Sequence, residues 1–472
     1  MPSPRRWFLC LARAVRNRGL RGLVGQLPFG EVLYDVAADF LGQLQSTGDD
    51  VRPEVEAASN LSGEALQQVV AEVVAEVVGD QPAEVRDAMT GYLMQVPATI
   101  RQTLRRPSDL TGTTVPPDFR FREPHDAVPV IPARLARFRI GQRAPGFSDW
   151  ELVELLGVGG FGEVWLAENR HLGERTALKF CLDASAAKSL LNEARLLKRL
   201  KVESGSLPNV VPLLGTSLAS EPPALMYRYI PGGDLTGLFR DWKALPDAER
   251  IDRAARLVRD LARAVGAAHR LPEMIVHRDL KPANVLIEKV AGEQFMVWIA
   301  DFGIGGIAAD KAIRDERSGT TTRGQRLSEY FRGAHSPGYA SPEQKREMPA
   351  NPRDDVYAMG VIWYQAILAD ITKDPTGDFD EVLEEMGVSA GQRKLLKRCI
   401  SSFAERRPAD GGVLADEIDA LLGATVEAKP QPPVPPVVPK VVERKPEPPK
   451  ERKAGELLTL RWEAVPTRPM PK

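Results

Sequence analysis

Three polar side chains of complementary chemistry, Asp279, Lys281 and Asn284, lie in one short stretch of the sequence. Apolar runs precede and follow this stretch, so we expect it to form a loop between buried segments. A second carboxylate, Asp301, follows a further apolar run. Carboxylate and carboxamide oxygens suit Mg²⁺, a lysine can neutralise phosphate charge, and a carboxylate can accept the proton of a hydroxyl. The set therefore predicts phosphoryl transfer.

A glycine-rich segment, residues 157–164, follows a predicted strand over residues 150–156. Glycine lets the backbone come close to phosphate groups, because a Cβ atom would collide with the ligand or forbid the turn. The pattern alone also fits a plain turn, or a dinucleotide-binding fold in which the third glycine would open a helix. Residues 163–166 predict a second strand instead, so we expect a hairpin that covers phosphates.

Two further charged residues can be assigned a function only in combination with the other motifs of the chain. Lys179 ends a strand-like run, and Glu193 lies within a predicted helix. Taken singly, a lysine at a strand end is most often exposed to solvent, and a glutamate on a helix most often belongs to its solvated face.

With these motifs in this order, the chain resembles the eukaryotic-like Ser/Thr protein kinase family in its bacterial form. Ser341-Pro342-Glu343 is similar to the motif that ends the family's activation segment, with serine in place of the common alanine. Residues 354–360 resemble the buried helix that anchors the catalytic loop, and Arg407 resembles the arginine that pairs with the motif glutamate. The resemblance covers about residues 150–423 and does not extend to the flanking regions.

The resemblance implies a role for each residue that matches a family motif. Asp279 would be the catalytic base, and Lys281 would contact the γ-phosphate, where lysine marks Ser/Thr rather than Tyr specificity. Lys179 would contact the α- and β-phosphates of ATP and would be held in place by Glu193.

The resemblance also implies ATP and Mg²⁺ as ligands. Asn284 and Asp301 would bind Mg²⁺. The positions implied to contact ATP are Gly157, Val158, Gly159, Gly160, Phe161, Gly162, Val164, Ala177, Lys179, Tyr229 and Leu286.

Two features near the implied active site depart from the family pattern. Arg228 stands in the lobe-connecting segment where many relatives have an acidic residue, and His335-Ser336 replaces the usual Gly-Thr. The span from Asp301 to Glu343 is also long for an activation segment. Its hydroxyls lie among arginines, which fits either a polar loop or autophosphorylation. The candidate sites are Ser318, Thr320, Thr321, Thr322 and Ser328.

The order of the motifs requires two lobes of different secondary structure. Short alternating strands occur first, as over residues 176–180, and longer helical patterns follow, as over residues 251–269. We expect an α+β, bilobal protein kinase fold, with a small β-rich N-lobe and a large helical C-lobe, preceded by an all-α region. The predicted domains are a helical N-terminal domain over 1–106, a Pro-rich linker over 107–147, the kinase domain over 148–423 and a Pro-rich disordered tail over 424–472.

Apolar residues recur at helical spacing in the N-terminal region, as in Val70, Val73, Val74 and Val77. The linker that follows lacks periodicity, and fully extended it would span on the order of 100 Å. We therefore expect that the helical domain need not touch the active site and can serve to dock a partner. A chain that begins near Ala144 is expected to fold and to keep kinase activity.

The first helical stretch is strongly basic between Arg5 and Arg21, and Trp7, Phe8 and Leu11 can share one of its faces. Such a stretch can lie on a membrane surface. Packing against the rest of the N-terminal region is the favoured interpretation, because Arg18 interrupts the apolar face.

Composition excludes several classes of protein. The 472 residues exceed one ordinary domain, and the formal net charge of -1 argues against a protein that coats nucleic acid. Three scattered cysteines argue against a disulfide framework or a structural zinc site. Because no apolar run reaches membrane-spanning length, we expect a cytoplasmic protein.

The predicted function is transfer of the ATP γ-phosphate to Ser or Thr hydroxyls of protein substrates, with autophosphorylation in signal transduction. Two alternatives stay open. The first is a catalytically weak ATP-binding scaffold, a pseudokinase. The second is a small-molecule kinase of related fold, against which the resemblance of Lys281-Pro282 and Ser341-Pro342-Glu343 to motifs for polypeptide docking argues.

Overall fold

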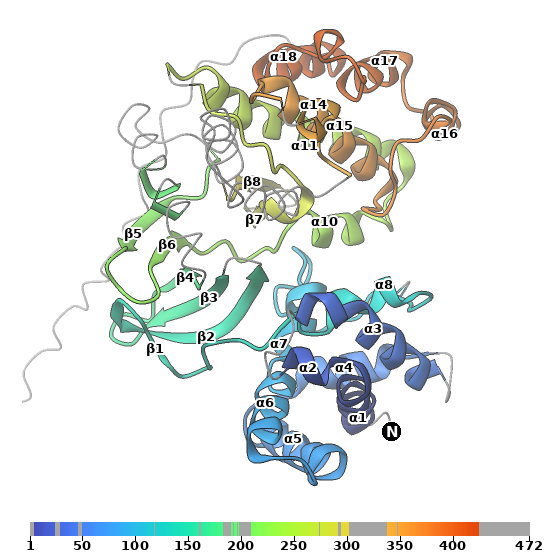
Figure 1. Ribbon diagram of the computed structural model, residues 1–472. Helices are drawn as coiled ribbons and strands as arrows, with labels where there is room; N and C mark the ends of the chain where they lie inside the picture. The colour runs from blue at the N-terminus through green and yellow to red at the C-terminus, as the bar shows by residue number, and fades with distance from the viewer. Residues whose placement is uncertain are drawn as a thin grey trace, which may run out of the picture. The chain divides into compact units, whose positions relative to one another are not determined.

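The computed structural model describes residues 4–23, 29–45, 50–117, 119–159, 162–182, 190–191, 193–195, 197, 209–272, 274–290, 294–301, 338–346 and 348–423, and Figure 1 labels their helices and strands. Several predictions fall outside these residues. They concern the Pro-rich tail over 424–472, the five candidate phosphorylation sites, His335-Ser336, and the glycine-rich residues Gly160 and Phe161.

The N-terminal region is helical, as its apolar periodicity predicts. Its elements are α1 (Pro4–Ala14), a π-helical turn (Val15–Gly19), α2 (Leu20–Leu23), α3 (Phe29–Gln45), α4 (Arg52–Asn60), α5 (Gly63–Val78), α6 (Ala83–Leu93) and α7 (Val96–Leu104). Their apolar faces share one core, in which the rings of Trp7 and Phe40 meet edge to face with centroids 4.8 Å apart. The valine stripe of α5 faces this core, since Val70, Val73 and Val77 are buried.

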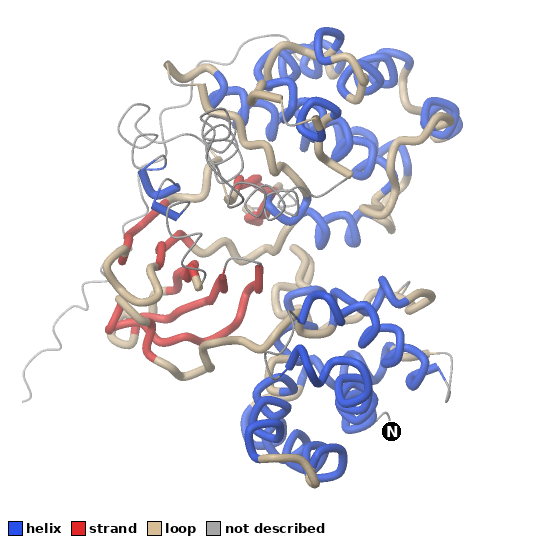
Figure 2. The backbone as a smooth tube through the Cα atoms, in the orientation of Figure 1, coloured by secondary structure: helices blue, strands red, loops and turns tan. Residues whose placement is uncertain are grey.

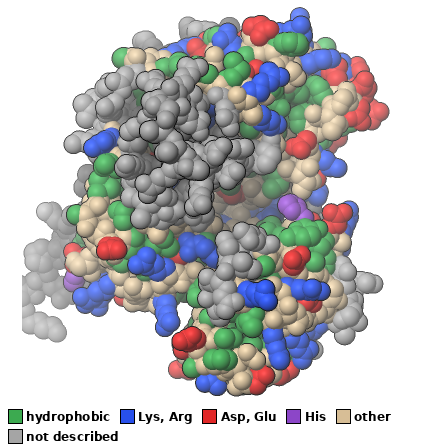
Figure 3. Space-filling model, in the orientation of Figure 1, with side chains coloured by type: hydrophobic (Ala, Val, Ile, Leu, Met, Phe, Trp, Pro, Cys, Tyr) green, Lys and Arg blue, Asp and Glu red, His purple; other side chains and the backbone are tan. Residues whose placement is uncertain are grey.

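Helix α1 uses its apolar face inside the protein. Trp7, Phe8 and Leu11 are fully buried, and the guanidinium groups of Arg5 and Arg13 pair with the Glu76 carboxylate on α5. On the face drawn in Figure 3, basic and acidic side chains lie interspersed over the helical region. The burial of the apolar face of α1 is what the favoured interpretation, packing of this helix against the rest of the N-terminal region, predicts.

Residues 107–147 differ from the extended connector expected from their proline content. They include α8 (Pro124–Ala127) and a 3-10 turn (Val128–Val130), and Phe121 and Ala127 are buried in the helical core. The Tyr92 hydroxyl of α6 also donates a hydrogen bond to the Pro132 carbonyl at 2.8 Å. The apolar residues between the prolines bury enough surface for this segment to pack.

The small lobe is a six-stranded antiparallel sheet, drawn in red in Figure 2. Its strands are β1 (Arg143–Ala144), β2 (Phe147–Gly159), β3 (Gly162–Asn169), β4 (Arg175–Cys181), β5 (Leu213–Ser217) and β6 (Ala224–Arg228), in the spatial order β1-β2-β3-β4-β6-β5. Gly159 pairs with Gly162 at the end of the antiparallel β2–β3 ladder. The glycine-rich segment is thus a hairpin, as predicted, and not the entrance to a helix.

The large lobe is mainly helical, which confirms the predicted α+β, bilobal fold. Its elements are α10 (Leu235–Trp242), α11 (Asp247–His269), a 3-10 turn (Pro282–Asn284), β7 (Val285–Lys289), β8 (Phe295–Ile299), α14 (Pro342–Lys345), α15 (Pro352–Leu368), α16 (Phe379–Glu385), α17 (Ala390–Cys399), a 3-10 turn (Ala404–Arg406) and α18 (Gly411–Leu421). Helix α11 packs against both α15 and α18. No helix in the described ranges is both long and apolar enough to cross a membrane.

Candidate active site

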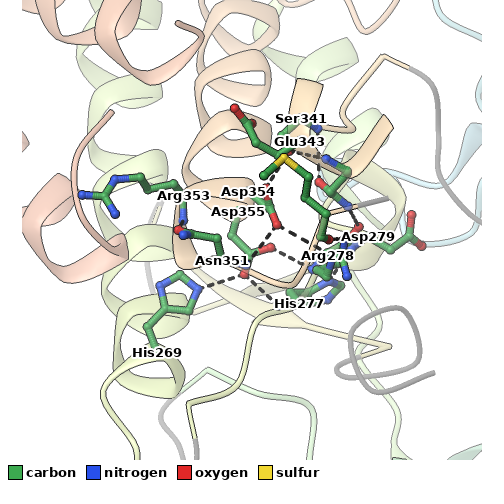
Figure 4. Close-up of polar contacts among 12 residues, drawn as sticks. His269, His277, Arg278, Asp279, Ser341, Glu343, Asn351, Arg353, Asp354 and Asp355 are labelled. Atoms are coloured by element: carbon green, nitrogen blue, oxygen red, sulfur yellow. Dashed lines mark hydrogen bonds and ion pairs between the residues drawn. The ribbon is translucent and has the colours of Figure 1, made fainter. Parts of the chain in front are cut away.

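The loop that carries Asp279, Lys281 and Asn284 is held by one buried carboxylate, Asp355 of α15. Its oxygens accept the backbone N–H groups of His277 at 2.7 Å and Arg278 at 2.8 Å, as Figure 4 shows. The His269 Nε2 atom lies 2.9 Å from the same carboxylate. His269 Nδ1 accepts the Gly411 N–H, so Nε2 carries the proton and donates it to Asp355. These contacts hold Arg278 at φ 62°, a left-handed conformation that is uncommon for a non-glycine residue.

Asp279, Lys281 and Asn284 converge at the end of this loop. The Lys281 Nζ atom lies 3.1 Å from Asp279 Oδ2. The Asn284 side-chain amide donates to the Asp279 backbone carbonyl at 2.7 Å and to its carboxylate at 3.1 Å. Both Asp279 and Lys281 keep about a quarter of their side-chain surface exposed, at 23% and 27%. An oriented carboxylate therefore faces outward beside a cation.

Lys179 of β4 is the centre of a three-residue ionic cluster. Its Nζ atom lies 3.1 Å from both Glu193 carboxylate oxygens and 2.7 Å from Asp301 Oδ1. Burial disfavours the charged amine, but Asp301 and Glu193 outweigh that effect and raise the Lys179 pKa. Burial likewise opposes ionisation of Asp301, yet Lys179 lowers its pKa overall. Lys179 is thus a fixed cation at neutral pH.

The Glu193 side chain is fully buried, and a second side chain besides Lys179 binds its carboxylate. The hydroxyl of Tyr227, at the end of β6, donates a hydrogen bond to Glu193 Oε1. Burial raises the pKa of Tyr227 well above its usual value, and the neighbouring Glu193 charge adds to this effect. Tyr227 therefore stays a neutral donor that orients the partner of Lys179.

A pocket between the lobes contains many of the residues expected to contact ATP. Val158, Gly159 and Gly162 lie on the covering hairpin and are not among the lining residues. The positions expected to contact ATP that do line the pocket are Gly157, Val164, Ala177, Lys179, Tyr229 and Leu286, and the two expected Mg²⁺ ligands, Asn284 and Asp301, line it as well. Asp279 and Lys281 lie next to it through their contacts with Asn284 and with each other.

Sequence reasoning missed other residues that line this pocket. Val211, Ile230 and Asp234 come from the segments around the lobe connection. More unexpectedly, Gln102 and Arg105 at the end of α7 line it as well. Asp234 follows a Gly-Gly pair beside the lobe-connecting strand, which is a usable signal. No local pattern marks Gln102 or Arg105, because both belong to the separate helical region.

The end of the activation segment is tied to the catalytic loop. The Ser341 hydroxyl donates to Asp354 at 2.6 Å, and the Gln344 amide donates to the Arg278 carbonyl at 2.7 Å. Arg407 donates from Nη2 to Glu343 Oε2 at 2.7 Å, the pairing that the resemblance implied. Its side chain is fully buried, so this ion pair has a structural role.

We expect Glu343→Gln to lower stability at neutral pH by about 1–3 kcal/mol, because it leaves a buried guanidinium with a neutral partner. Burial opposes ionisation of Glu343, but the Arg407 hydrogen bond lowers its pKa overall. A lowered carboxyl pKa stabilises the fold above the usual glutamate pKa, and this contribution is lost as the pH falls.

Thermal unfolding of the wild type and the variant should therefore converge as the pH falls from 7 to below about 4. The control is Glu384→Gln, since Glu384 pairs with Arg393 but is 69% exposed and should contribute little. A difference in melting temperature that stays constant with pH would contradict the role of the Glu343 charge.

Comparison with known proteins agrees with this geometry. The protein kinase domain family matches residues 150–408, more than half of the chain, and the chain belongs to this family. It is 28% identical over 295 residues to the serine/threonine-protein kinase pkn2 of Myxococcus xanthus, covering 58% of this chain and 32% of the relative. It is 30% identical over 239 residues to the serine/threonine-protein kinase PkaA of Streptomyces coelicolor, covering 47% and 39%. The predicted kinship with bacterial Ser/Thr kinases is confirmed.

Among solved structures, the Mycobacterium tuberculosis PknI kinase domain aligns with 19% identity and a TM-score of 0.42, covering 60% of this chain and 99% of that one. The chain spans half or less of the length of the curated relatives it matches.

Proposed function

We propose that this protein is a Ser/Thr protein kinase that transfers the γ-phosphate of ATP to Ser or Thr hydroxyls of protein substrates. The observation that carries the proposal is the convergence of Asp279, Lys281 and Asn284 beside the pocket that Lys179 lines. A base, a cation and a metal-binding amide are the groups that phosphoryl transfer needs in one place.

In this proposal, the Asp279 carboxylate orients the attacking hydroxyl and accepts its proton as the new O–P bond forms. The bond between the β- and γ-phosphates breaks, and ADP leaves with the electron pair. Lys281 and Lys179 offset negative charge on the γ-phosphate and on the α- and β-phosphates, respectively. Each cation is held in place by a carboxylate, so its position beside the pocket is set before ATP binds.

The residues at the pocket suit Mg²⁺ in combination with ATP. The Asn284 amide nitrogen is directed at Asp279, which leaves its carbonyl oxygen as the ligand atom, and the Asp301 side chain is 44% exposed at the pocket. No group of three or more His, Cys, Asp or Glu side chains in the described part of the chain could hold a metal ion. Two oxygen ligands completed by phosphates are typical of Mg²⁺ sites. Bound there, the ion would neutralise phosphate charge.

Asp301→Asn is expected to weaken ATP binding about tenfold in the presence of Mg²⁺ and far less in its absence, because one charged ligand is lost. Calorimetric titration with ATP, with and without Mg²⁺, measures both values. Asp279→Asn, treated in parallel, should retain the gain in affinity that Mg²⁺ gives. If both variants keep the same Mg²⁺-dependent gain, Asp301 has no metal role.

Phosphosite mapping tests the function as a whole. Incubation of the purified chain with ATP and Mg²⁺, alone and with a generic protein substrate, should yield phosphoserine or phosphothreonine by mass spectrometry, and Asp279→Asn should not. ATP binding without any phosphoprotein would favour the scaffold. ATP consumption with a small acceptor only would favour the small-molecule kinase. The Ser and Thr residues between Asp301 and Glu343, which lie among arginines in the sequence, are the proposed autophosphorylation sites.

The proposed setting is the cytoplasm, where ATP is available and where the thiols of the three cysteines, Cys10, Cys181 and Cys399, would stay reduced. The N-terminal helical region is also proposed to dock a partner.

A further inference from the structure

The C-terminal end of α7 lies at the edge of the nucleotide pocket. Gln102 and Arg105 line the pocket together with Tyr229 and Gly233, which follow the lobe-connecting strand β6. Figure 1 shows α7 beside β2, the strand that leads into the glycine-rich hairpin. The helical region therefore contributes to the wall of a pocket that otherwise belongs to the kinase lobes.

Arg105 binds the small lobe through its side chain. Its Nη2 atom donates to both carboxylate oxygens of Glu154 on β2, at 2.7 and 2.8 Å. The Nη1 atom donates to the Gln102 side chain, and Nε donates to the Leu110 carbonyl. The Arg105 side chain is only 6% exposed and that of Glu154 is 15% exposed. A shielded, charge-assisted pair of this kind is among the stronger hydrogen-bonded contacts.

The same stretch binds the large lobe through its backbone. Gly237, in the first turn of α10, lies so close that an added Cβ atom would be 2.3 Å from the Arg105 carbonyl oxygen. At the end of α10, the Asp241 carboxylate accepts the Ser108 N–H at 2.9 Å and lies 3.1 Å from the Arg106 guanidinium. The Arg240 guanidinium also donates to the Thr103 carbonyl.

We propose that residues 103–108 form an interlobe clamp and that Arg105 is a positioning residue for ATP. The clamp joins β2, which carries the phosphate-covering hairpin, to α10, whose first turn follows the lobe connection. It thereby fixes the spacing between the two lobes that enclose the nucleotide. The proposal takes the pocket to be the ATP site and rests on the proposed function only to that extent.

A contact between the 107–147 segment and the small lobe supports this interpretation. Arg134 pairs with the fully buried carboxylate of Glu163 at 3.1 Å and donates to the Gly162 carbonyl at the base of the hairpin. The Ala136 N–H donates to Gln95, which lies between α6 and α7. The covering hairpin is thus tied to the helical region at a point separate from the clamp.

The experiment compares three variants of the full chain. Arg105→Gln removes the charge that binds Glu154. Gly237→Ala displaces the clamp backbone without removing any charged group, and alanine favours the α10 helix itself. The matched control is Arg13→Gln, which breaks an exposed pair with Glu76 inside the helical region. Calorimetry with ATP gives the dissociation constant, steady-state kinetics give KM and kcat, and circular dichroism monitors folding.

We expect Arg105→Gln and Gly237→Ala each to raise the ATP dissociation constant and KM by about tenfold, as for a typical coupling between two sites. The kcat at saturating ATP should change by less than about twofold. Once ATP is bound, its binding energy restores the lobe spacing that the clamp sets in the free protein. Arg13→Gln should leave all three values unchanged. A mere loss of fold stability would instead lower the melting temperature without a selective change in ATP affinity.

Wild-type ATP affinity in both clamp variants, with normal circular dichroism, would overturn the proposal. If Arg105→Gln does not fold, Gly237→Ala alone decides between the two outcomes. If the wild type binds ATP but phosphorylates nothing, the proposed kinase function is wrong. The ATP dissociation constants of the variants still test the clamp in that case. Unchanged binding together with normal phosphorylation contradicts the clamp alone.

Discussion

Asp279→Asn is expected to reduce phosphoryl transfer at least about a hundredfold, the usual contribution of a general base, while ATP binding stays near the wild-type value. The amide has the same shape as the carboxylate but cannot accept the hydroxyl proton. The loop should keep its position, because His277 and Arg278 are held by Asp355 and not by Asp279. Radiolabel transfer to a generic protein substrate and calorimetric ATP titration measure the two effects.

The control for this variant is Asp416→Asn, at an exposed position of α18. It should have wild-type activity. Transfer by Asp279→Asn at the wild-type rate would show that another group accepts the proton, and would remove Asp279 from the mechanism.

Lys179→Met should have the second largest effect, with a loss of transfer of about 100- to 1000-fold, comparable with removal of one preorganised donor from an active site. ATP affinity should fall as well, because Lys179 lines the pocket as a fixed cation. Stability should also drop by about 3–5 kcal/mol, since the fully buried Glu193 loses its counter-ion.

Chemical denaturation and kinase assays measure both consequences for Lys179→Met. The control is Lys397→Met, where the lysine side chain is 66% exposed. Full stability of Lys179→Met together with lost activity would mean that Tyr227 alone can satisfy Glu193.

Most of the fold follows from periodicity that can be read in the chain. The α5 stripe and the strands around Lys179 were predictable, because side chains that share a face recur at fixed spacing in either kind of element. The motifs around Asp279 are equally local, since the loop brings residues near in sequence together in space.

What the sequence does not reveal are contacts between charged residues that are distant along the chain. Arg105 and Glu154 each look like surface charges in their own segments, and only the packing of α7 against β2 buries them together. Glu163 likewise lies in a predicted strand, and no local sequence pattern indicates its ion pair with Arg134. The proline-rich stretch also misled, because its few apolar residues are enough to dock it. The expectation that a chain starting near Ala144 works alone therefore conflicts with the proposed clamp.

The hydrogen bond from Tyr227 to Glu193 has a consequence for inhibitor design. A compound that displaces the Tyr227 ring from the pocket wall leaves a buried carboxylate without one of its donors, at a cost of about 1–3 kcal/mol. Compact ligands that stay in front of this ring avoid that penalty. They can gain selectivity from Gln102 and Arg105, which also line the pocket and which a kinase without the helical region lacks.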